Sequence, residues 1–548
     1  MEVIMARQIM LQARHALHEL LLPQAPALVV FSSVLVIIAL LIVRRRIGSS
    51  SDTSRRARDE QLLRKLPSPP GRLPIIGHLH LVGSLPHVSL RDLAAKHGGD
   101  GGLMLLRLGA VPTLVVSSAS GAQAVLRTHD HVFASRAYSP VTDILFYGST
   151  DVAFAPYGEH WRQVRKIATT HLLTNRKVRS YRHAREHEVS LVMAKLRREA
   201  SAGAAVDLSD LLNSFTNDVV CHAVSGKFFR EGGRNRIFRE LVEANSSLIG
   251  GFNLEDYFPA LVKMDMIRRT VCAKARRVNA MWDQLLDKLI DDHASSNKQP
   301  TAAEESDDFI DVLLSVQHEY NLTRDHIKAQ LAIMFEAGTD TSFIVLEYAM
   351  VRLMQNPRIM NELQAEVRNN IVLANNKGNK EDVVTEDDIK TLAYLKAVIK
   401  ETIRLHMPAP LLVPHLSMAD CDIQGYTIPA GTRAIVNSWA LARDPSYWED
   451  AEEFRPERFM EAGGGSAAAV DYKGNDFFYL PFGTGRRICP GINFAISTTQ
   501  IMLANLVYHF DWELPLELAE KGIDMTESFG VTVHRTEKLL LVPVVPQD

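Results

Sequence analysis

Apolar residues recur every three or four positions along most of this 548-residue chain. The repeat is clearest in residues 166–200, 279–293 and 323–357, and this spacing gives each segment one apolar helix face. Thr323 stands at the start of the third segment, where its side-chain oxygen can cap the first turn. Short β-branched runs that predict strands occupy residues 113–118, 433–437 and 539–545. The pattern therefore predicts a mainly α-helical body with small β-sheets, and no GxGxxG turn of a doubly wound α/β fold follows a strand.

One segment departs from this amphipathic pattern. Residues 25–43 contain no charged side chain, and Arg44, Arg45 and Arg46 follow directly. As a helix rising 1.5 Å per residue, this run would span about 28 Å, close to the roughly 30 Å hydrocarbon core of a bilayer. A cleaved signal peptide usually carries its basic residues in front of a shorter apolar region, so we favour a retained transmembrane anchor over a cleaved signal. The positive-inside rule then places everything after Arg44 in the cytosol.

These features divide the chain into an N-terminal lead (1–24), the anchor (25–43), a basic and Pro-rich hinge (44–75) and one large domain (76–548). The prolines of the hinge cannot continue a helix and bias their predecessors toward extended structure. Length alone would allow three or four domains. No repeat and no strong linker divides the chain after residue 75, so we expect a single domain there.

Composition excludes several classes of function. With 46% hydrophobic and 23% charged residues, the chain is an ordinary globular protein with a large core. A net charge of −3 provides no basic footprint, so we expect no nucleic-acid partner. Four cysteines in 548 residues indicate a reducing compartment. Because no CxxC pair occurs, a closed zinc site or a redox dithiol is not expected.

The remaining candidate chemistry is a lone thiolate at Cys489, in the segment PFGTGRRICPG (481–491). The other cysteines, Cys221, Cys272 and Cys421, are interpreted as buried, inert thiols. The segment resembles, position by position, the haem-binding loop of the cytochrome P450 monooxygenases. The matching positions are Phe482, Gly485, Arg487, Cys489 and Gly491.

This resemblance implies a haem b whose iron takes the sulfur of Cys489 as its axial ligand, and a thiolate ligand favours cleavage of the O–O bond. Backbone amides and the following helix N-terminus are expected to lower the pKa of Cys489. Gly485 and Gly491 would let the backbone approach the porphyrin closely. Arg487 would neutralise a haem propionate through a charge-assisted hydrogen bond.

A Glu-x-x-Arg pair, Glu401 and Arg404, resembles a second element of the family. The same spacing occurs elsewhere in the chain, but this pair lies on an apolar-periodic helix, where positions i and i+3 share a face. It is followed by FRPERF, whose Arg458 resembles the third member of the family's Glu–Arg–Arg network. The resemblance implies a buried structural charge cluster that fixes the loop carrying Cys489.

The segment AGTDTS (337–342) resembles the family's oxygen-activation motif. The resemblance makes Thr341 and Asp340 the candidate catalytic residues, with a hydroxyl and a carboxyl that together deliver protons. Such a pair favours a monooxygenase that uses dioxygen over a relative that rearranges peroxides.

In WRQVRK, Trp161 and Arg165 resemble the helix that contacts a haem propionate. The basic run that follows, residues 165–185, is interpreted either as a solvated helix face or as the docking patch for an acidic reductase. His415 stands where many plant relatives carry an arginine that contacts a propionate. Either His415 supplies that contact or another residue does.

Taken together, the resemblance implies a haem-thiolate monooxygenase that inserts one oxygen atom from O₂. NADPH would provide electrons through a cytochrome P450 reductase, with cytochrome b5 as a second candidate donor. Membrane lipid is a further expected partner, since the microsomal members are single-pass proteins of the endoplasmic reticulum membrane with a cytosolic catalytic domain. The alternatives from other classes are a haem-binding membrane protein that only binds gas or carries electrons, and a purely structural membrane protein.

The segments that form substrate pockets in this family are mostly apolar and aromatic here, which favours a small, flat, weakly polar substrate. RTHDHVFASR, STDVAFAPYG and YHFDWELP resemble the grass monooxygenases that oxidise indole and its lactam derivatives toward benzoxazinoid (DIBOA-type) defence compounds. The alternative is a monooxygenase of another hydrophobic plant metabolite or xenobiotic, such as a terpenoid, a phenolic or a herbicide.

Overall fold

The computed structural model describes residues 50–99, 101–226, 234–251, 253–260, 265–295, 307–371, 383–461 and 467–546. The predicted lead (1–24) and anchor (25–43) lie outside the described residues. Within the described ranges, no helix is both long enough and apolar enough to cross a bilayer. Of the predicted hinge, residues 50–63 form a helix, and the Pro-rich part that follows packs onto the body, where the N–H of Leu105 donates to the carbonyl of Pro67 (2.7 Å).

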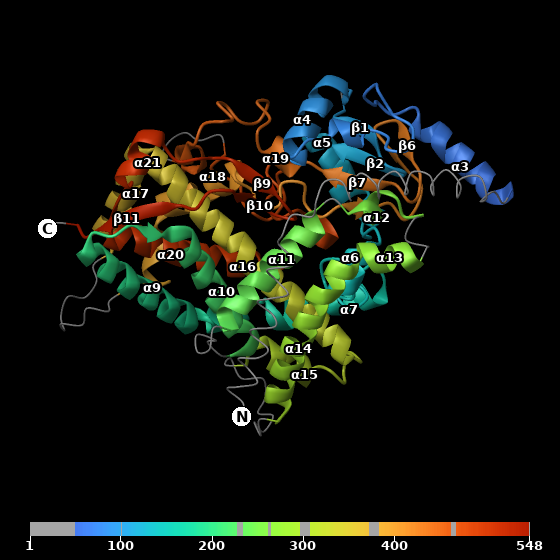
Figure 1. Cartoon of the computed structure of the whole chain (residues 1–548). Coiled ribbons are helices and arrows are strands. Elements are labelled where there is room, and N and C mark those ends of the chain that lie inside the picture. The colour runs from blue at the N-terminus through green and yellow to red at the C-terminus, as the bar shows by residue number, and fades with distance from the viewer. Residues whose placement is uncertain are drawn as a thin grey trace.

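Helices make up most of the body (Figure 1), as the apolar periodicity predicts. They are α3 (Ser50–Leu63), α4 (Pro86–His97), α5 (Ala119–Gln123), α6 (Pro140–Leu145), α7 (Glu159–Ile167), α8 (Asn175–Ser180), α9 (Arg182–Ala202), α10 (Leu208–Ser225), α11 (Arg234–Gly250), α12 (Leu254–Tyr257), α13 (Asp265–Val271), α14 (Ala273–Ser295), α15 (Phe309–Ser315), α16 (Arg324–Gln355), α17 (Pro357–Asn370), α18 (Ala393–Leu405), α19 (Ser438–Leu441), α20 (Ile492–His509) and α21 (Leu516–Lys521).

The strands are short and form small sheets. They are β1 (Leu103–Leu108), β2 (Val111–Val116), β3 (Val206–Asp207), β4 (His415–Leu416), β5 (Cys421–Ile423), β6 (Tyr426–Ile428), β7 (Arg433–Val436), β8 (Asp511–Glu513), β9 (Glu527–Phe529), β10 (Val533–Arg535) and β11 (Leu540–Val544). The largest sheet has the order β1-β2-β7-β4, a second has β3-β11-β8, and β5-β6 and β9-β10 are hairpins. All three predicted strand runs are confirmed, as β2, β7 and β11.

The central element of the helical part is α16. Its N-cap Thr323 accepts the N–H of His326 at 3.1 Å, so the predicted cap is confirmed. Most of the helix is buried on every side, because α10 packs along one flank while α18 and α20 pack along others. The enclosed helix nevertheless carries buried polar and charged side chains, among them Lys328, Glu336 and Asp340.

One predicted helical segment is interrupted. Residues 166–200 do not form a continuous helix, because α7 ends at Ile167 and a wider turn follows before α8 and α9. Thr174 adopts an extended conformation, and its hydroxyl accepts the N–H of Lys177 at 3.1 Å. A threonine cap of this kind starts a new helix in the middle of the periodic pattern.

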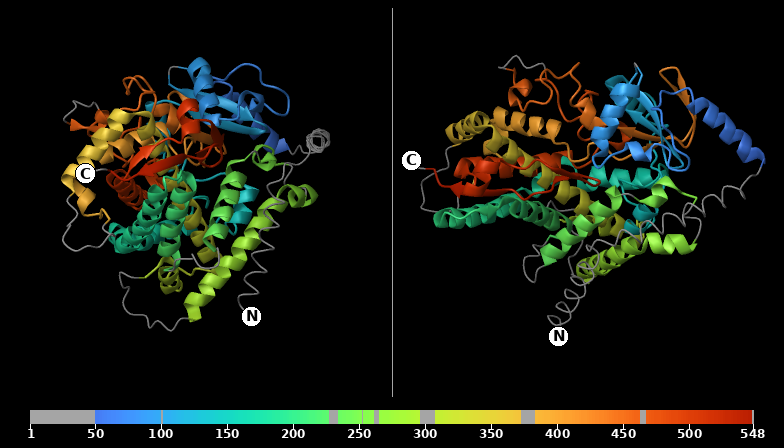
Figure 2. Two further views of the ribbon diagram at one scale, coloured as in Figure 1. Left: turned by 60° about the vertical axis from the view of Figure 1, so that its left-hand side comes forward. Right: turned by 45° about the horizontal axis from the view of Figure 1, so that its top comes forward.

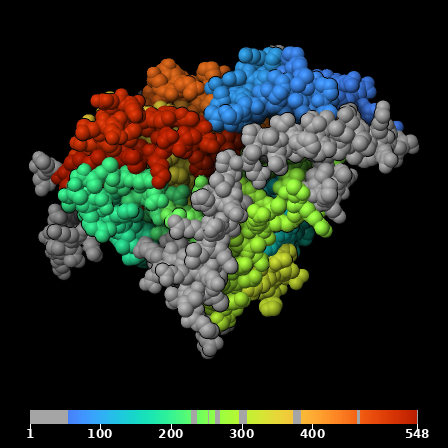
Figure 3. Space-filling view, in the orientation of Figure 1, coloured from blue at the N-terminus to red at the C-terminus, as the bar shows by residue number. Residues whose placement is uncertain are grey.

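Segments from the two ends of the chain complete the body. Strand β11 pairs with β3 and lies beside α9, and Figure 2 shows this C-terminal strand next to the helix in both views. In the space-filling view of Figure 3, the red C-terminal residues adjoin both a green stretch and the blue N-terminal part of the described chain on one face of the molecule. Among the described residues, the last strand of the chain thus packs against segments from its first half.

Candidate active site

A cavity of about 280 Å³ lies between α16, the loop before α20 and the segment 408–415. Its wall is mostly apolar. The polar and charged groups that reach it are few, namely Arg136, Arg165, Thr341, Ser342, His415, Thr484, Arg487, Cys489 and Thr499. A mainly apolar cavity with a few convergent polar groups is the usual form of a cofactor or substrate site.

Cys489 lies at one wall of this cavity, at the end of a loop that is held together by a backbone hydrogen bond. Its N–H donates to the carbonyl of Phe482 at 2.9 Å, and the N–H of Gly491 donates to its Sγ at 3.3 Å. Gly491 is the N-cap of α20, so the sulfur lies at the N-terminus of a long helix. This arrangement presents one sulfur atom to the cavity with a backbone donor beside it.

The pKa of the Cys489 thiol differs from the sequence expectation. Burial raises this pKa, and the Gly491 N–H and the nearby Arg165 lower it only in part. The predicted lowering by backbone and helix groups exists, but desolvation is the larger effect. The protein groups alone therefore do not hold the sulfur as a thiolate.

Gly485 allows a close backbone contact, but with the protein chain and not with the cavity where a porphyrin would bind. Its φ is +70°, and a Cβ atom there would lie 2.4 Å from the carbonyl oxygen of Leu126. The close backbone approach at this glycine is thus to the turn after α5, and Gly485 is not part of the cavity wall. At Gly491 a Cβ atom would lie 3.7 Å from Sγ of Cys489, which is an ordinary contact.

Three arginines, Arg136, Arg165 and Arg487, reach the cavity; we call them the cavity arginines. Arg487 donates to the carbonyls of Ala134 (2.7 Å) and Ala155 (2.6 Å). Arg136 donates to the carbonyls of Val413 (2.5 Å) and Pro414 (3.1 Å). Within the described parts of the chain, no carboxylate forms an ion pair with any of the cavity arginines, and no hydrogen bond from the Arg165 guanidinium is present.

Burial explains the electrostatics of this group. It lowers the pKa of Arg136 and of Arg165, and it lowers the pKa of Arg487 to about 9. Asp151 is a nearby acid, but burial raises the pKa of its carboxyl to about 6, which makes it a weak counter-ion. A buried cation without a full counter-ion raises the free energy of the folded protein. A ligand with anionic groups would remove this penalty, so the cavity is suited to such a ligand.

Arg136 was not among the predicted site residues. It lies in HVFASRAYS, between apolar and small residues, and no spacing in that segment marks it as functional. The segment RTHDHVFASR, which ends at Arg136, resembles the grass monooxygenases, but the burial of this arginine is seen only in the structure.

His415 lines the cavity, and its Nδ1 lies 2.8 Å from the carbonyl of Phe133. Burial, together with Arg136, lowers the pKa of this histidine well below its usual value. A neutral imidazole whose Nδ1–H donates to a carbonyl leaves Nε2 as an acceptor.

Trp161 and Arg165 lie on α7 and differ in position. Arg165 reaches the cavity, whereas Trp161 is buried behind its wall, and the indole N–H of Trp161 donates to the carbonyl of Val152 at 3.0 Å. The guanidinium of Arg487 lies over the Trp161 ring, 4.1 Å from its centroid. Trp161 therefore supports Arg487 from behind, and only Arg165 of the predicted pair faces the cavity directly.

The predicted oxygen-activation residues point to different sides of α16. Thr341 lines the cavity, and its hydroxyl donates to the carbonyl of Ala337 at 2.8 Å. Gly338 also lines the cavity, and it packs against α10, where a Cβ atom would lie 2.9 Å from Val220. Asp340 is buried and faces away from the cavity, where its carboxylate accepts the hydroxyl of Thr532.

Glu401, Arg404 and Arg458 are brought together as one cluster, which we call the Glu401 network. Oε2 of Glu401 lies 2.6 Å from Nε of Arg404, and Oε1 lies 3.0 Å from Nε of Arg458. The remaining donors of the two arginines bind backbone carbonyls between residues 442 and 453. The network thus ties α18 to the segment that leads toward the Cys489 loop.

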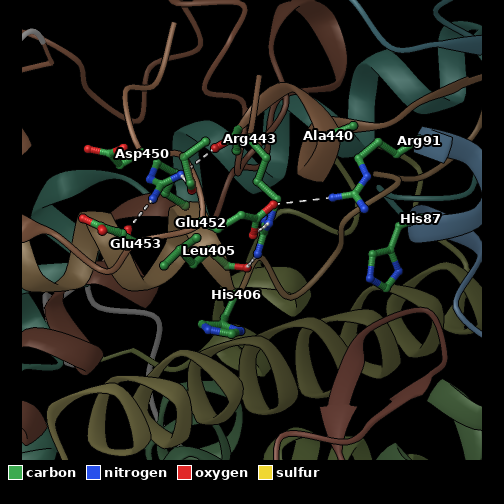
Figure 4. Close-up of polar contacts among 12 residues, drawn as sticks. His87, Arg91, Leu405, His406, Ala440, Arg443, Asp450, Glu452 and Glu453 are labelled. Carbon is green, nitrogen blue, oxygen red and sulfur yellow. Dashed lines mark hydrogen bonds and ion pairs between the residues drawn. The ribbon is translucent and has the colours of Figure 1, made fainter. Parts of the chain in front are cut away.

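Further charged contacts surround this network (Figure 4). Arg443 donates to the carbonyl of Leu405 and to Glu452 (3.1 Å), and Arg91 reaches the same carboxylate at 3.5 Å. Unlike Glu401, Glu452 is exposed, with 68% of its side-chain surface accessible. The Arg91–Glu452 pair is therefore screened by solvent and weak, whereas the Arg443 end of the other pair is buried.

The residues around the cavity fit a haem. A flat apolar body would occupy the space beside α16, the sulfur of Cys489 can ligate iron, and the cavity arginines provide the positive charge that two propionates require. This fit rests on the donor set and on the missing carboxylate partners of the arginines.

Comparisons with known proteins agree with this geometry. Residues 67–542 match the sequence profile of the family described as Cytochrome P450. The chain is 53% identical to indole-2-monooxygenase of Zea mays over 542 residues, covering 97% of this chain and 99% of the relative. It is 54% identical to 3-hydroxyindolin-2-one monooxygenase (91% of each chain) and 55% identical to indolin-2-one monooxygenase (90% and 91%), both of Zea mays.

A solved structure shows the same fold. A zebrafish cytochrome P450 with abiraterone superposes with a TM-score of 0.69 at 24% identity, covering 85% of this chain and 100% of that chain. The mainly helical architecture with small sheets is therefore that of a known fold.

Proposed function

We propose that this chain, which belongs to the cytochrome P450 family and is a haem-dependent monooxygenase, oxidises an indole-derived substrate on the way to benzoxazinoid compounds. The observation that carries the proposal is the identity of 53–55%, across nearly the whole chain, to three maize enzymes whose names specify indole or an indolinone. The cavity supports it, because small apolar residues such as Ala337, Ala409 and Val413 line a space suited to a small, flat, weakly polar ring.

Several residues of this chain have definite tasks in such a reaction. When bound, haem with a sulfur ligand supplies dioxygen activation and oxygen-atom insertion. Cys489 would hold the iron, and the cavity arginines would orient the group by pairing with its propionates. Thr341 places a hydroxyl at the cavity wall, where it holds a proton close to the reacting atoms. The apolar wall excludes bulk water from the same space.

The reaction requires a reductase that passes on electrons from NADPH, together with the substrate and O₂. We propose that residues 25–43 anchor the protein in the endoplasmic reticulum membrane with the catalytic domain in the cytosol. Supporting this is the uncharged run followed by Arg44, Arg45 and Arg46. Cytochrome b5 is a second candidate donor, and the basic residues after Arg165 are a candidate docking surface for a donor.

The identities of 53, 54 and 55% do not separate the successive indole-derived substrates from one another. Microsomes containing this protein and a reductase, offered indole, indolin-2-one, 3-hydroxyindolin-2-one and the hydroxybenzoxazinone singly, would identify the substrate. We expect NADPH-dependent turnover of one of them. Turnover of none, with a normal thiolate-type spectrum of the reduced carbon-monoxide complex, would instead favour another hydrophobic plant metabolite or a xenobiotic.

A further inference from the structure

A second pocket, of about 920 Å³, lies on the other flank of α16. It is bordered by α10, α11, α16 and the β9–β10 hairpin, which lie close together in Figure 1. In contrast to the cavity beside Cys489, this polar pocket is lined mainly by polar and charged side chains, among them Arg236, Arg239, Glu243, Ser246, Asp340, His534 and Lys538. Adjacent residues of one helix, Asp340 and Thr341, thus face two chemically different spaces.

Four polar side chains converge where Asp340 meets the polar pocket. The hydroxyl of Thr532 donates to Oδ2 of Asp340, and Nε2 of His534 lies 3.2 Å from the same oxygen. Thr532 Oγ1 also lies 2.9 Å from Nε2 of His534 and 3.1 Å from Oγ of Ser246. Asp340 has 7% of its side-chain surface exposed, whereas His534 has 30%. The histidine is therefore the member of this group that solvent in the pocket reaches most easily.

The charges around His534 favour its protonated form. Burial lowers its pKa, but Asp340, followed by Glu347 on α16 and Glu243 on α11, raises it by a larger amount. The nearby Arg535 is partly neutralised by Glu347, with 3.6 Å between Nη1 and Oε1. On the α16 side, Glu336 faces Asp340, and burial raises the pKa of the Glu336 carboxyl well above its usual value.

We propose that His534 is a positioning residue for oxygen activation, which holds the Asp340 carboxylate on the pocket side of α16 and returns protons to it from solvent. Insertion of one oxygen atom, with reduction of the other to water, consumes two protons and two electrons. Each proton would enter at the imidazole, pass from Nε2–H of His534 to Oδ2 of Asp340, and leave the carboxyl toward the Thr341 side. The proposal rests on the monooxygenase reaction and not on the identity of the substrate.

The distances explain why the histidine is needed. Asp340 is nearly inaccessible to solvent, so its carboxylate cannot be reprotonated directly from bulk water. His534 and Thr532 are the described groups within hydrogen-bonding distance of Oδ2, and a threonine hydroxyl can pass on a proton but cannot store one at neutral pH. An imidazole can do both, because its pKa lies near neutrality.

The test compares His534→Gln with wild type, using Thr532→Val as a second variant and Lys538→Gln as the matched control. Lys538 lines the same pocket and loses a charge in the control, but its ion pair is with Asp207, not with Asp340. We expect His534→Gln to lower product formed per NADPH about tenfold and to increase the solvent isotope effect, since positioned proton transfer contributes about 10²–10⁴ in rate. Thr532→Val should have a smaller effect in the same direction, and Lys538→Gln none.

A second measurement does not depend on turnover. Because the folded-state pKa of His534 is raised, its contribution to stability is full below the unfolded value near 6.5 and is lost as pH rises through the folded value. The difference in unfolding temperature between wild type and His534→Gln should therefore shrink as pH rises. Wild-type coupling and isotope effect in a folded His534→Gln protein would overturn the proposal, whatever substrate is used. Failure of all the indole compounds, with this pH-dependent difference intact, would affect the proposed substrate alone.

Discussion

Two groups of arginines in this chain differ in what neutralises their charge. In the Glu401 network, a fully buried carboxylate binds both guanidinium groups, and backbone carbonyls satisfy the remaining donors. The cavity arginines have only backbone carbonyls, or in the case of Arg165 no hydrogen bond among the described residues. Arg404, Arg458 and Arg136 are buried, whereas Arg165 and Arg487 are half-buried. Only the arginines of the Glu401 network are neutralised by a carboxylate of the protein.

This difference separates a structural cluster from a binding cluster. A buried charge that has a partner stabilises one arrangement of the chain, and removing that partner leaves an uncompensated charge. A buried charge without a partner destabilises the protein until a ligand of opposite charge binds. The comparison therefore predicts that mutations in the Glu401 network change folding, whereas mutations around the cavity change haem binding and activity.

The largest effect on activity is expected from Cys489→His. This side chain lies at the cavity and outside the Glu401 network, so the protein should fold and retain some haem. Imidazole lacks the electron donation of a thiolate, so the thiolate-type spectrum and oxygen insertion should both be abolished. The carbon-monoxide difference spectrum and product formation measure this, and undiminished activity would show that Cys489 is not the ligand.

The largest effect on stability is expected from Glu401→Gln. Two buried guanidinium groups would lose their shared carboxylate, which should cost about 3–5 kcal/mol in the free energy of unfolding. The matched control is Glu159→Gln, which removes an exposed carboxylate that pairs with the exposed Arg162 at the same i to i+3 spacing and should cost about 0–1 kcal/mol. Denaturant unfolding measures both, and equal losses would mean that the network is no more important than a surface pair.

Local sequence patterns predicted the parts of this site that depend on neighbouring residues. The Cys489 loop is a contiguous segment, and the Glu401–Arg404 pair needs only the i to i+3 geometry of a helix. The strands β2, β7 and β11 were likewise visible as short apolar, β-branched runs.

Features that depend on long-range packing were not predictable in the same way. Arg136 reaches the cavity only because the segment around it packs against residues 413–414, far away in sequence. The 3.6-residue repeat places Asp340 and Thr341 on different flanks of α16, but it does not say which flank meets the Cys489 loop. The role of His534 depends on a hairpin that begins about 170 residues after the end of α16. Similarly, Gly485 is required by Leu126, a contact that no local pattern contains.

A smaller effect, confined to haem binding, is expected from Arg165→Met. The substitution removes a cavity arginine without a hydrogen-bond partner, so the haem-free protein should lose no stability. Haem should dissociate about 10–100-fold faster, because a hydrogen bond to a charged group is worth about 1.5–3 kcal/mol. Transfer of haem to an acceptor protein measures this rate.

Arg162→Met is the control for that experiment. Arg162 lies on the same helix, α7, but is exposed and pairs with Glu159 at 2.7 Å instead of reaching the cavity. We expect its haem dissociation rate to equal that of wild type. A loss of folding stability in Arg165→Met comparable to that in Glu401→Gln would remove the distinction between the two arginine groups.

The smallest effect is expected from Trp161→Phe. Its size decides whether Trp161 only supports Arg487 or itself binds a haem propionate. If Trp161 only supports Arg487, the variant loses the hydrogen bond to Val152 and part of a cation–π contact, while the guanidinium stays in place. Such a contact is worth about 0.5–1 kcal/mol, so haem dissociation should accelerate only about two- to fivefold. Tyr157→Phe is the control, because Tyr157 packs against Trp161 with 5.4 Å between ring centroids and keeps its ring. Trp161→Phe could instead release haem as fast as Arg165→Met. That result would mean that the indole N–H binds a propionate directly when haem is present, as the resemblance of WRQVRK implies. The hydrogen bond to Val152 would then exist only in the haem-free protein.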